Sequence, residues 1–284
     1  MPAQTPNLTN SPPAAEIDAE SYKFLQDYVY RESGIVLDGD KRYLLEARLT
    51  CIVRQRQLTS MNGLCALLQA NNDAVLKRQV VEAMTTHETT FFREPAQYDA
   101  LKTLILPGLI EQRRDTRKLS FWSAAASSGQ EAYSLAMMLL DMGLGDWSIQ
   151  ILGTDLSTQV LERAQAGKYM QIEVNRGLPV SYLVKYFMRS GLDWQLKDEV
   201  RRMVRFMPFD LRQSMRALGP FDIVFCRNVL IYFDIENKRK ILAELRETLF
   251  HGGYLLLGGS ETTLNLDNRF ERKIVGPAVF YQAP

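Results

Sequence analysis

The stretch Leu119-Ser-Phe-Trp-Ser-Ala-Ala-Ala-Ser-Ser-Gly-Gln-Glu131 decides the fold, because an apolar run passes within it into a turn of small residues. The apolar run predicts a strand, and residues 129–142 after the turn have the spacing of a helix. The pattern then repeats, with a strand predicted over 149–153 and a helix over 157–167 that Ser157 is expected to cap. Strands that alternate with helices predict a doubly wound α/β sheet, which binds ligands at the carboxyl ends of its strands.

The alternation continues toward the C-terminus. The further predicted elements are a helix over 178–187, a strand over 221–226, a helix over about 235–249, and strands over 253–257 and 278–282. The last two strands lie near enough in the chain to form a terminal hairpin. Between the two parts of the sheet, residues 189–208 alternate charged and apolar side chains, which predicts a small antiparallel β insert at about 188–208.

The chain before residue 118 has helical patterns and no convincing strand. The predicted helices cover 21–33, about 41–57, 61–70, 73–84 and 98–112. We therefore expect an all-helical N-terminal domain over 17–85, followed by the α/β domain over 86–284. Residues 1–16 are rich in Pro, Asn, Thr and Ala and lack the basic start and apolar core of a signal peptide, so we expect a disordered leader.

Composition excludes several classes of protein. Hydrophobic residues make up 46% and charged residues 24%, a soluble globular balance, and no stretch approaches the roughly 18 apolar residues of a membrane span. The net charge of +1 gives no electrostatic case for nucleic acid. The three cysteines show no metal spacing and favour a reduced cytoplasmic compartment, and two histidines are too few for a histidine-based metal site. We expect a cytoplasmic monomer without a metal.

The first strand–helix turn and the end of the second strand indicate a ligand site. Small residues at 123–128 let the backbone approach a ligand, and the next helix offers free N–H groups, although an ordinary turn has the same composition. Asp155 ends the second strand, where a carboxylate accepts hydrogen bonds from both ribose hydroxyls; the alternative is that it caps the next helix. Neither G-x-G-x-x-G nor a P-loop is present, so an adenosyl ligand without phosphates, such as S-adenosylmethionine, fits better than NAD.

Four motifs carry a family resemblance. They are TTHETTFFRE at 85–94, WSAAASSGQEAY at 122–133, FDIVFCRNVLIYFD at 221–234 and GGYLLLGGSE at 252–261. Together they resemble the chemoreceptor glutamate O-methyltransferases, the CheR family, from about residue 20 to the C-terminus. The resemblance implies a Rossmann-like class I methyltransferase domain, a small helical N-terminal domain and a small β-subdomain. It also implies S-adenosyl-L-methionine as cofactor and S-adenosyl-L-homocysteine as product.

The resemblance also implies a set of cofactor contacts, carried over by position in the motifs. They are His87, Thr89, Arg93, Glu131, Asp155, Asp210, Leu211, Asn228 and Val229. His87 and Asp210 each stand where the family usually has Asn. Both side chains still form hydrogen bonds, but Asp210 lacks the donating NH2 group of Asn. The turn that commonly ends Gly-Glu-Glu-Pro in the family is Gly129-Gln-Glu131-Ala132 here, so its second acid is kept.

The implied reaction is an in-line attack by a glutamate carboxylate on the sulfonium methyl group. A general base is not needed, because a glutamate with a pKa of about 4.3 is already ionised at pH 7. Desolvation and orientation of this carboxylate must therefore supply the rate acceleration. Arg93 is the expected fixed cation, paired with the cofactor carboxylate or orienting the glutamate; the alternative is a surface ion pair with Glu94. Tyr232 is expected near the methyl group, and the alternative is a buried aromatic beside Phe233.

The predicted helix over 41–57 is expected to meet the receptor. It carries five basic residues against one acid, a net charge of +4. Chemoreceptor methylation regions are acidic helices, so this charge would steer docking, with Arg48 and Arg54 as the candidates, although a solvated helix face has the same composition. Some family members also bind a C-terminal receptor peptide through the β-subdomain. The insert is short here, so we expect recognition that is independent of such a tether.

The expected function is therefore a chemotaxis protein methyltransferase that esterifies receptor glutamates during sensory adaptation. A methyltransferase for RNA or a small molecule is one alternative, but nucleic-acid amino-methylating enzymes read Asn/Asp-Pro-Pro-Tyr where this chain has Arg227-Asn-Val-Leu. A non-catalytic receptor- or nucleotide-binding module is a second, and retention of Arg93, Glu131, Asp155 and Tyr232 argues against it. A dehydrogenase is a third alternative, but this chain lacks the dinucleotide fingerprint that a dehydrogenase needs.

Overall fold

The computed structural model describes residues 17–70 and 73–284, so the leader expected at 1–16 lies outside the described residues. The chain divides into two compact units. The smaller unit contains Val36–Met84 and the described residues before Ser33, and the larger contains Ser33–Ile35 and Thr85–Pro284. Among the described residues, no helix is both long and apolar enough to cross a membrane.

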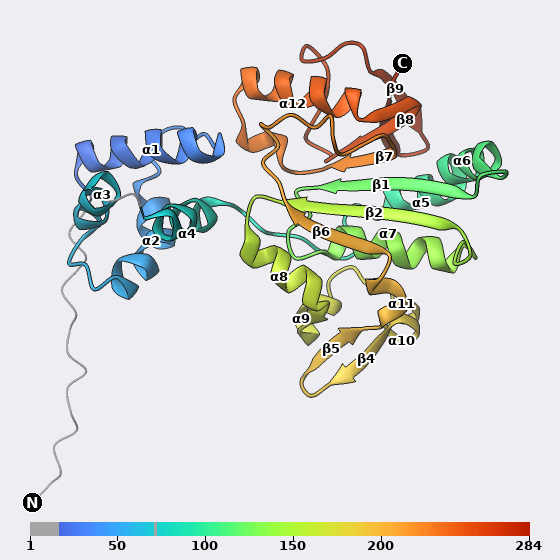
Figure 1. Cartoon of the computed structure of the whole chain (residues 1–284), viewed down its shortest axis with the longest axis horizontal. Helices are drawn as coiled ribbons and strands as arrows, with labels where there is room; N and C mark the ends of the chain where they lie inside the picture. Colours follow the sequence, from blue (N-terminus) through green and yellow to red (C-terminus); the bar gives the residue numbers. More distant parts are fainter. Residues whose placement is uncertain (1–16, 71–72) are drawn as a thin grey trace, which may run out of the picture. The chain divides into compact units, whose positions relative to one another are not determined.

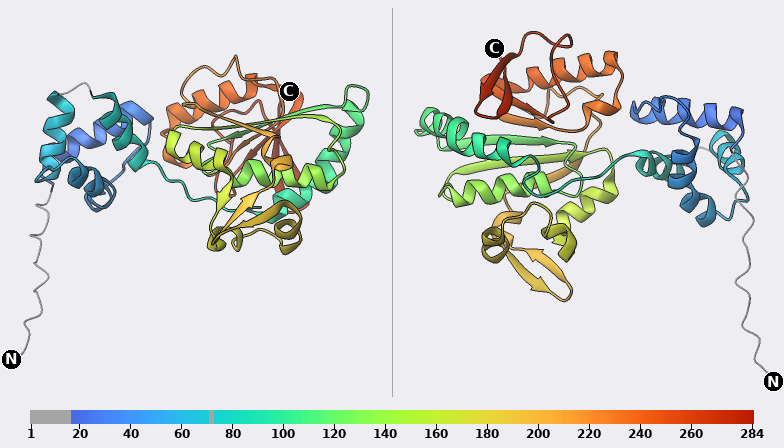
Figure 2. Two further views of the ribbon diagram at one scale, coloured as in Figure 1. Left: turned by 60° about the horizontal axis from the view of Figure 1, so that its bottom comes forward. Right: turned by 180° about the vertical axis from the view of Figure 1, so that it is seen from behind.

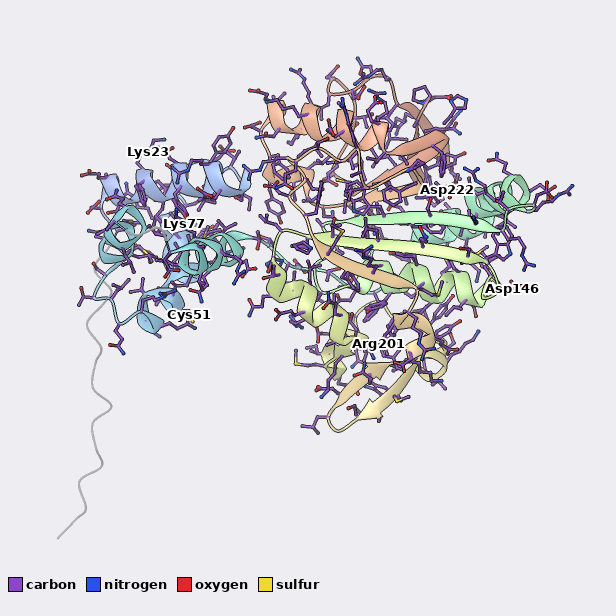
Figure 3. The ribbon with its side chains drawn as sticks, viewed as in Figure 1. Lys23, Cys51, Lys77, Asp146, Arg201 and Asp222 are labelled. Carbon is purple, nitrogen blue, oxygen red and sulfur yellow. The ribbon has the colours of Figure 1, made fainter. Side chains whose placement is uncertain are left out.

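The described residues of the smaller unit form four helices, as predicted (Figure 1). They are α1 (Ala19–Ser33), α2 (Arg42–Gln55), α3 (Met61–Ala70) and α4 (Ala74–Met84). Each predicted helix is confirmed to within two residues at either end. On α2 the buried side chains Leu45, Leu49, Ile52 and Val53 recur every three to four residues, so they form the single apolar face that an amphipathic helix packs inward. Cys51, labelled in Figure 3, lies on the exposed side of this helix.

The larger unit is built on a seven-stranded sheet with the order β6-β2-β1-β7-β8-β10-β9. The strands are β1 (Lys118–Ala124), β2 (Ser148–Asp155), β6 (Val204–Pro208), β7 (Phe221–Cys226), β8 (Leu249–Leu257), β9 (Glu271–Val275) and β10 (Ala278–Gln282). The first five in the sheet order are parallel, and β10 pairs antiparallel with both of its neighbours. The predicted α/β fold is therefore confirmed.

Helices cover both faces of the sheet. They are α5 (Pro95–Ala100), α6 (Leu106–Arg113), α7 (Gln130–Asp141), α8 (Thr158–Ala166) and α12 (Ile235–Glu247). The fully buried strand β7 shows why, because its side chains alternate between two cores. Ile223 and Phe225 belong to the core that contains α7, whereas Val224 and Cys226 belong to the core that contains α12. A strand that is apolar on both sides must be covered on both faces.

The insert is antiparallel, as predicted, but the predicted boundaries of 188–208 are wrong. Its three strands are β3 (Lys168–Tyr169), β4 (Phe187–Ser190) and β5 (Asp193–Leu196), with the order β3-β5-β4. Three short helices, α9 (Gln171–Val174), α10 (Val180–Tyr186) and α11 (Asp198–Arg201), flank them. Residues 204–208 instead form β6, the edge strand parallel to β2. Alternating charged and apolar residues fit both a hairpin strand and a half-exposed edge strand, so the pattern did not separate the two. Figure 2 shows β4 and β5 projecting from the larger unit.

The C-terminal hairpin was also predicted from the wrong pair of strands. The strands β8 and β10 do pair antiparallel, but β10 forms its hairpin with β9, which the sequence did not indicate. The charged sequence of β9 (ERKIV) is typical of an exposed edge strand rather than an alternating buried one.

The helix predicted over 98–112 is interrupted by a π-helical turn, η1 (Leu101–Ile105). Pro107 follows this turn; it donates no backbone hydrogen bond and its ring crowds the preceding turn.

Asp222, labelled in Figure 3, lies near the amino-terminal end of β7. This buried carboxylate accepts hydrogen bonds from Arg113 Nη2 at 2.9 Å and from Ser120 N at 2.8 Å.

Candidate active site

A pocket of the larger unit lies at the carboxyl ends of β1, β2, β6 and β7. The loops after these strands line it together with residues 85–93, which we call the threonine-rich segment. All ten residues predicted to bind the cofactor or to act in transfer line this one pocket: His87, Thr89, Arg93, Glu131, Asp155, Asp210, Leu211, Asn228, Val229 and Tyr232. Residues far apart in the sequence therefore meet where parallel sheets bind ligands.

The turn after β1 is held in unusual backbone conformations. Ala125 has φ +67°, Ser127 has φ +51° and Gly129 has φ +93°. Ala126 N donates to Thr154 O at 2.7 Å, which ties the turn to the end of β2. A Cβ on Gly129 would lie 3.0 Å from the Cβ of Ala164 and 3.1 Å from the rings of Phe206 and Tyr133. Left-handed non-glycine residues are rare and persist where the surroundings determine them, often at functional sites.

Asp155 joins the turn to the end of β2. Its Oδ2 accepts from Ser127 N at 2.9 Å and its Oδ1 accepts from Ser157 N at 3.0 Å. The cap of α8 is Ser157, as predicted, because its hydroxyl accepts from Val160 N; Asp155 is therefore not the helix cap. Burial raises the pKa of Asp155 above its ordinary value, against the opposing effects of the two N–H donors and of nearby His87. Asp155 lines the pocket.

The threonine-rich segment is anchored to the same turn. Ser127 Oγ donates to the carbonyl of His87 at 2.9 Å, and the ring Nε2 of His87 lies 2.6 Å from Thr85 Oγ1. Phe91, just beyond, packs edge-on against Tyr169 of β3 and Phe187 of β4. The insert therefore helps to fix the backbone that carries Thr89 and Arg93.

Arg93 presents its positive charge to the pocket. Its Nη1 donates to the carbonyl of Glu88 at 3.1 Å, and no carboxylate in the described parts of the chain forms an ion pair with it. The alternative ion pair with Glu94 is absent from these described residues, because Glu94 accepts from Gly259 N at 3.2 Å and faces Arg227 at 3.4 Å. A half-buried guanidinium without an acidic partner favours an anionic ligand.

Arg227, which sequence reasoning did not select, is the most buried charge in the pocket lining. Its side chain is 1% exposed, its Nη1 donates to Glu131 Oε2 at 3.0 Å, and its Nη2 donates to the carbonyl of Arg93 at 2.6 Å. Burial opposes its charge, but Glu131, Tyr98 and Glu94 outweigh that effect and raise the pKa of Arg227. The available signal was a charged residue placed directly after a fully buried strand.

Glu131 lies in the first turn of α7 and is held on both carboxylate oxygens. Besides the ion pair with Arg227, its Oε1 accepts from Ser123 Oγ at 2.7 Å. A carboxylate at the first turn of a helix also meets the positive end of the helix dipole. Glu131 still lines the pocket, so it combines a structural bond with a face toward the ligand.

The loop after β7 carries the other wall of the pocket. Asn228 has φ +57°, and Tyr232 ends a short 3-10 helix, η2 (Leu230–Tyr232). Phe233 is buried, whereas Tyr232 is partly exposed and its hydroxyl has no hydrogen-bond partner within the described residues. Glu261 holds this loop through backbone N–H groups and was also not selected from the sequence, although its motif was.

The remaining wall follows β6. Asp210 forms a two-pronged ion pair with Arg212, in which Arg212 Nη2 lies 2.6 Å from Oδ2 and Nε lies 3.1 Å from Oδ1. Leu211 is buried beside it and supplies an apolar surface. Asp210 Oδ1 also accepts from Arg212 N at 2.9 Å, and an ionised carboxylate has no donor, as expected from the departure from Asn.

The pocket fits an adenosyl ligand that ends in an amino acid. Its lining combines the carboxylate of Asp155, the apolar side chain of Leu211 beside the acceptor Asp210, and the guanidinium of Arg93, which are groups that such a ligand needs. The turn after β1 contains one glycine and no lysine, so it does not offer the cradle of a phosphate-binding loop. This donor set matches S-adenosylmethionine better than a nucleoside phosphate.

The two predicted docking residues of the smaller unit differ in their surroundings. Arg48 Nη1 donates to the carbonyl of Met84 at 2.7 Å, the last residue of α4, so it satisfies a free helix-end carbonyl. Arg54 is exposed. Nearby Arg56 pairs with Asp73 at 3.0 Å. Arg54 is therefore the better placed of the pair for contact with a partner.

Comparisons with known proteins match both parts of the chain to one family. Residues 87–276 match the family described as CheR methyltransferase, SAM binding domain, and residues 20–85 match CheR methyltransferase, all-alpha domain. Chemotaxis protein methyltransferase 1 of Pseudomonas aeruginosa is 40% identical over 276 residues, which cover 95% of this chain and 99% of the relative. Chemotaxis protein methyltransferases of Vibrio parahaemolyticus (38% identical, covering 95% and 98%) and Listeria monocytogenes (34% identical, covering 87% and 91%) are also similar.

The order of the two matched domains is the order of the two units in the chain. The similarity to the Pseudomonas and Vibrio relatives also covers nearly the whole length of this chain and of each relative. The chain belongs to the CheR methyltransferase family and is an S-adenosylmethionine-dependent chemotaxis protein methyltransferase.

Proposed function

We propose that the enzyme esterifies glutamate side chains of methyl-accepting chemoreceptors, giving glutamate methyl esters and S-adenosylhomocysteine for sensory adaptation in the cytoplasm. The relatives are named chemotaxis protein methyltransferases, which supports a receptor acceptor. The observation that carries the proposal is the guanidinium of Arg93, which lines the pocket without a carboxylate partner in the described residues. A cation in that state suits a reaction that brings two carboxylates, one on the cofactor and one on the acceptor, to one place.

The pocket residues divide the cofactor between them. Asp155 accepts hydrogen bonds from the ribose hydroxyls. Asp210 accepts a hydrogen bond from the amino group of the adenine, and Leu211 and Val229 cover the faces of the adenine ring. His87, Thr89 and Asn228 supply polar contacts along the pocket wall. Glu131 faces the ammonium group of the amino-acid end, and Arg93 its carboxylate. When bound, S-adenosylmethionine would supply an electrophilic methyl group on its sulfonium. The residues of the chain hold that methyl group in place.

Transfer then depends on how the chain places the acceptor carboxylate. A glutamate carboxylate is ionised at neutral pH, so no residue has to remove a proton. Tyr232, whose hydroxyl is free of other hydrogen bonds within the described residues, donates to the incoming carboxylate and aims one oxygen at the methyl group. Buried Phe233 and Leu211 exclude water on the same side, which keeps the carboxylate reactive.

The acceptor chemistry is tested by methyl transfer to a purified chemoreceptor cytoplasmic fragment. The full chain is incubated with methyl-labelled S-adenosylmethionine, and the protein-bound label is treated with mild base. Carboxyl methyl esters release their label as methanol, whereas methylated nitrogen does not. Stable label, or label on no protein, would contradict the proposal.

We also propose that the smaller unit docks on the receptor and that a C-terminal peptide tether is not used. The basic helix α2 with exposed Arg54 suits an acidic partner. In the insert, Ser190 of β4 pairs directly with Asp193 of β5, which leaves only Gly191 and Leu192 in the connecting turn. So tight a turn offers little surface for a peptide. Binding of a receptor C-terminal peptide in calorimetry would contradict tether independence.

We further propose that the enzyme acts as a monomer, which light scattering tests.

A further inference from the structure

The carboxylate of Glu261 accepts hydrogen bonds from four backbone N–H groups. Its Oε2 accepts from Asn228 N at 2.7 Å and from Gly258 N at 2.8 Å. Its Oε1 accepts from Val229 N at 2.9 Å and from Ile231 N at 3.3 Å. Three of the four donors belong to the loop after β7. One side chain therefore satisfies most of the free N–H groups of that loop.

The same loop carries the pocket wall opposite Asp155. Asn228, Val229 and Tyr232 line the pocket, whereas Glu261 does not. The φ of Asn228 is +57°, a left-handed backbone that a non-glycine residue adopts at a cost. Such a conformation persists only where the surrounding contacts determine it. The N–H bonds from residues 228 and 229 to Glu261 are contacts of that kind.

Gly258 supports the loop from the same side. A Cβ on Gly258 would lie 2.9 Å from both Cγ and N of Asn228, so no larger residue fits without moving the loop. Glu261 N donates to Gly258 O at 2.8 Å, which closes a tight turn at the end of β8. Gly258 and Glu261 thus form one rigid support beneath Asn228.

We propose that Glu261 is a positioning residue for methyl transfer, which sets the places of Asn228, Val229 and Tyr232 through the backbone N–H groups of their loop. The proposal rests on the pocket roles proposed above and adds a residue that touches neither cofactor nor acceptor. A carboxylate suits the task because it offers about four lone pairs and no donor. Hydrogen bonds to an ionised acceptor are also about twice as strong as neutral ones. A glutamine would turn an NH2 group toward N–H donors.

The test compares E261Q with D267N in the full-length chain. Asp267 is the comparison carboxylate, because it is buried in the same C-terminal segment, forms ion pairs with Arg246 and Arg269, and does not line the pocket. We measure kcat, the KM for each substrate and the melting temperature. E261Q is expected to lower kcat about 100-fold, the effect of displacing reacting groups by about 1 Å, and to raise the KM for the cofactor. D267N is expected to lower the melting temperature and to leave kcat unchanged.

Two kinetic outcomes would overturn the inference. One is E261Q with kcat and KM within about twofold of the wild-type chain. The other is D267N that loses kcat to the same degree as E261Q at an equal loss of melting temperature. E261D, which keeps the charge on a shorter side chain, is expected to recover part of the rate and replaces E261Q if that variant does not fold. If neither folds, Glu261 is a structural residue and the inference is wrong. Absence of transfer by the wild-type chain contradicts the proposed function itself, so the two failures are distinguishable.

Discussion

Arg227 and Glu131 form a buried ion pair, with Arg227 Nη1 3.0 Å from Glu131 Oε2. Arg227 follows β7 and Glu131 lies in the first turn of α7, and Arg227 Nη2 donates to the carbonyl of Arg93. One guanidinium thus joins three segments that line the pocket. The contribution of such a pair lies in position, because loss of either partner leaves an unpaired buried charge.

Replacing Arg227 by methionine is expected to destabilise the protein. The carboxylate of Glu131 would remain buried without its cation, which costs about 3–5 kcal/mol in the free energy of unfolding. Urea denaturation measures the change. The matched control is Arg114→Met, whose ion pair with Glu111 is exposed, so its cost is about 0–1 kcal/mol. Equal stability of the two variants would show that the buried pair does not hold the site together.

Arg93→Ala is expected to abolish most transfer while the chain stays folded. The side chain makes one hydrogen bond to a carbonyl, so its removal changes the free energy of unfolding by only about 0.5–1.5 kcal/mol. Loss of a cation aimed at the reacting carboxylates is expected to lower kcat/KM by about 100-fold or more. Initial-rate kinetics measure kcat/KM, and thermal unfolding measures the change in stability. Near-normal turnover would remove Arg93 from the reaction.

Asp155 predicts a pH dependence of cofactor binding. Hydroxyl donors bind the ionised carboxylate, and burial raises the pKa of Asp155 above its ordinary value of 3.8. In the free protein the carboxyl therefore takes up a proton at a higher pH than an ordinary aspartate does. Calorimetry is expected to show a rising Kd for S-adenosylmethionine as the pH falls toward that raised pKa. Asp155→Asn is expected to bind weakly with a flatter profile. A wild-type Kd that is constant with pH while the protein is folded would contradict the assignment.

The raised pKa of Asp155 affects protein stability in the opposite direction from cofactor binding. A carboxyl whose folded pKa lies above its unfolded value binds its proton more tightly in the folded state. Its contribution to the free energy of unfolding therefore falls as the pH rises between the two pKa values. Saturating cofactor is expected to reduce this fall, because its hydroxyls stabilise the ionised form.

Tyr232→Phe separates the aimed hydroxyl from a packed aromatic ring. The hydroxyl has no hydrogen bond within the described residues, so the free energy of unfolding is expected to change by less than about 0.5 kcal/mol. Loss of a hydrogen bond to an ionised acceptor costs about 1.5–3 kcal/mol, which lowers kcat roughly 10–100-fold. Unchanged kcat would show that the hydroxyl of Tyr232 takes no part in transfer.

Arg54→Glu tests the docking role of α2. Because Arg54 is exposed, reversing its charge is expected to weaken receptor binding at low salt, to have less effect at high salt, and to leave stability unchanged. Arg48→Glu is the comparison, because it also removes the hydrogen bond to Met84 and is expected to destabilise the smaller unit. Salt-dependent binding to a receptor fragment measures both. Equal binding by the Arg54 variant and the wild-type chain would contradict the role.

The sequence predicted elements whose periodicity is strong and sites whose residues lie in motifs. The strand β7 and the helix α3 were predicted with their observed bounds, because their apolar spacing leaves one interpretation. The ten predicted pocket residues meet because parallel strands bring their carboxyl ends together. The insert was misplaced because β3 has only two residues and because the edge strand β6 shares the alternation of a hairpin.

Arg227 and Glu261 were missed for a different reason. Arg227 acts on Glu131, 96 residues away, and Glu261 acts on the backbone of Asn228, 33 residues away. Both act through contacts that only the tertiary fold creates, and the bonds of Glu261 to backbone N–H groups leave no mark on the residue types of the loop. A sequence pattern indicates which residues face a ligand more readily than which residues hold them in place.

The account is tested most directly by locating the transferred methyl group. A chemoreceptor cytoplasmic fragment is methylated by the wild-type chain and digested, and mass spectrometry identifies the modified side chains. The account predicts methyl esters on glutamates, lost when those glutamates are replaced by alanine and nearly absent with Arg93→Ala. Methylation on nitrogen, or no methylation by a chain that binds S-adenosylmethionine, would contradict it.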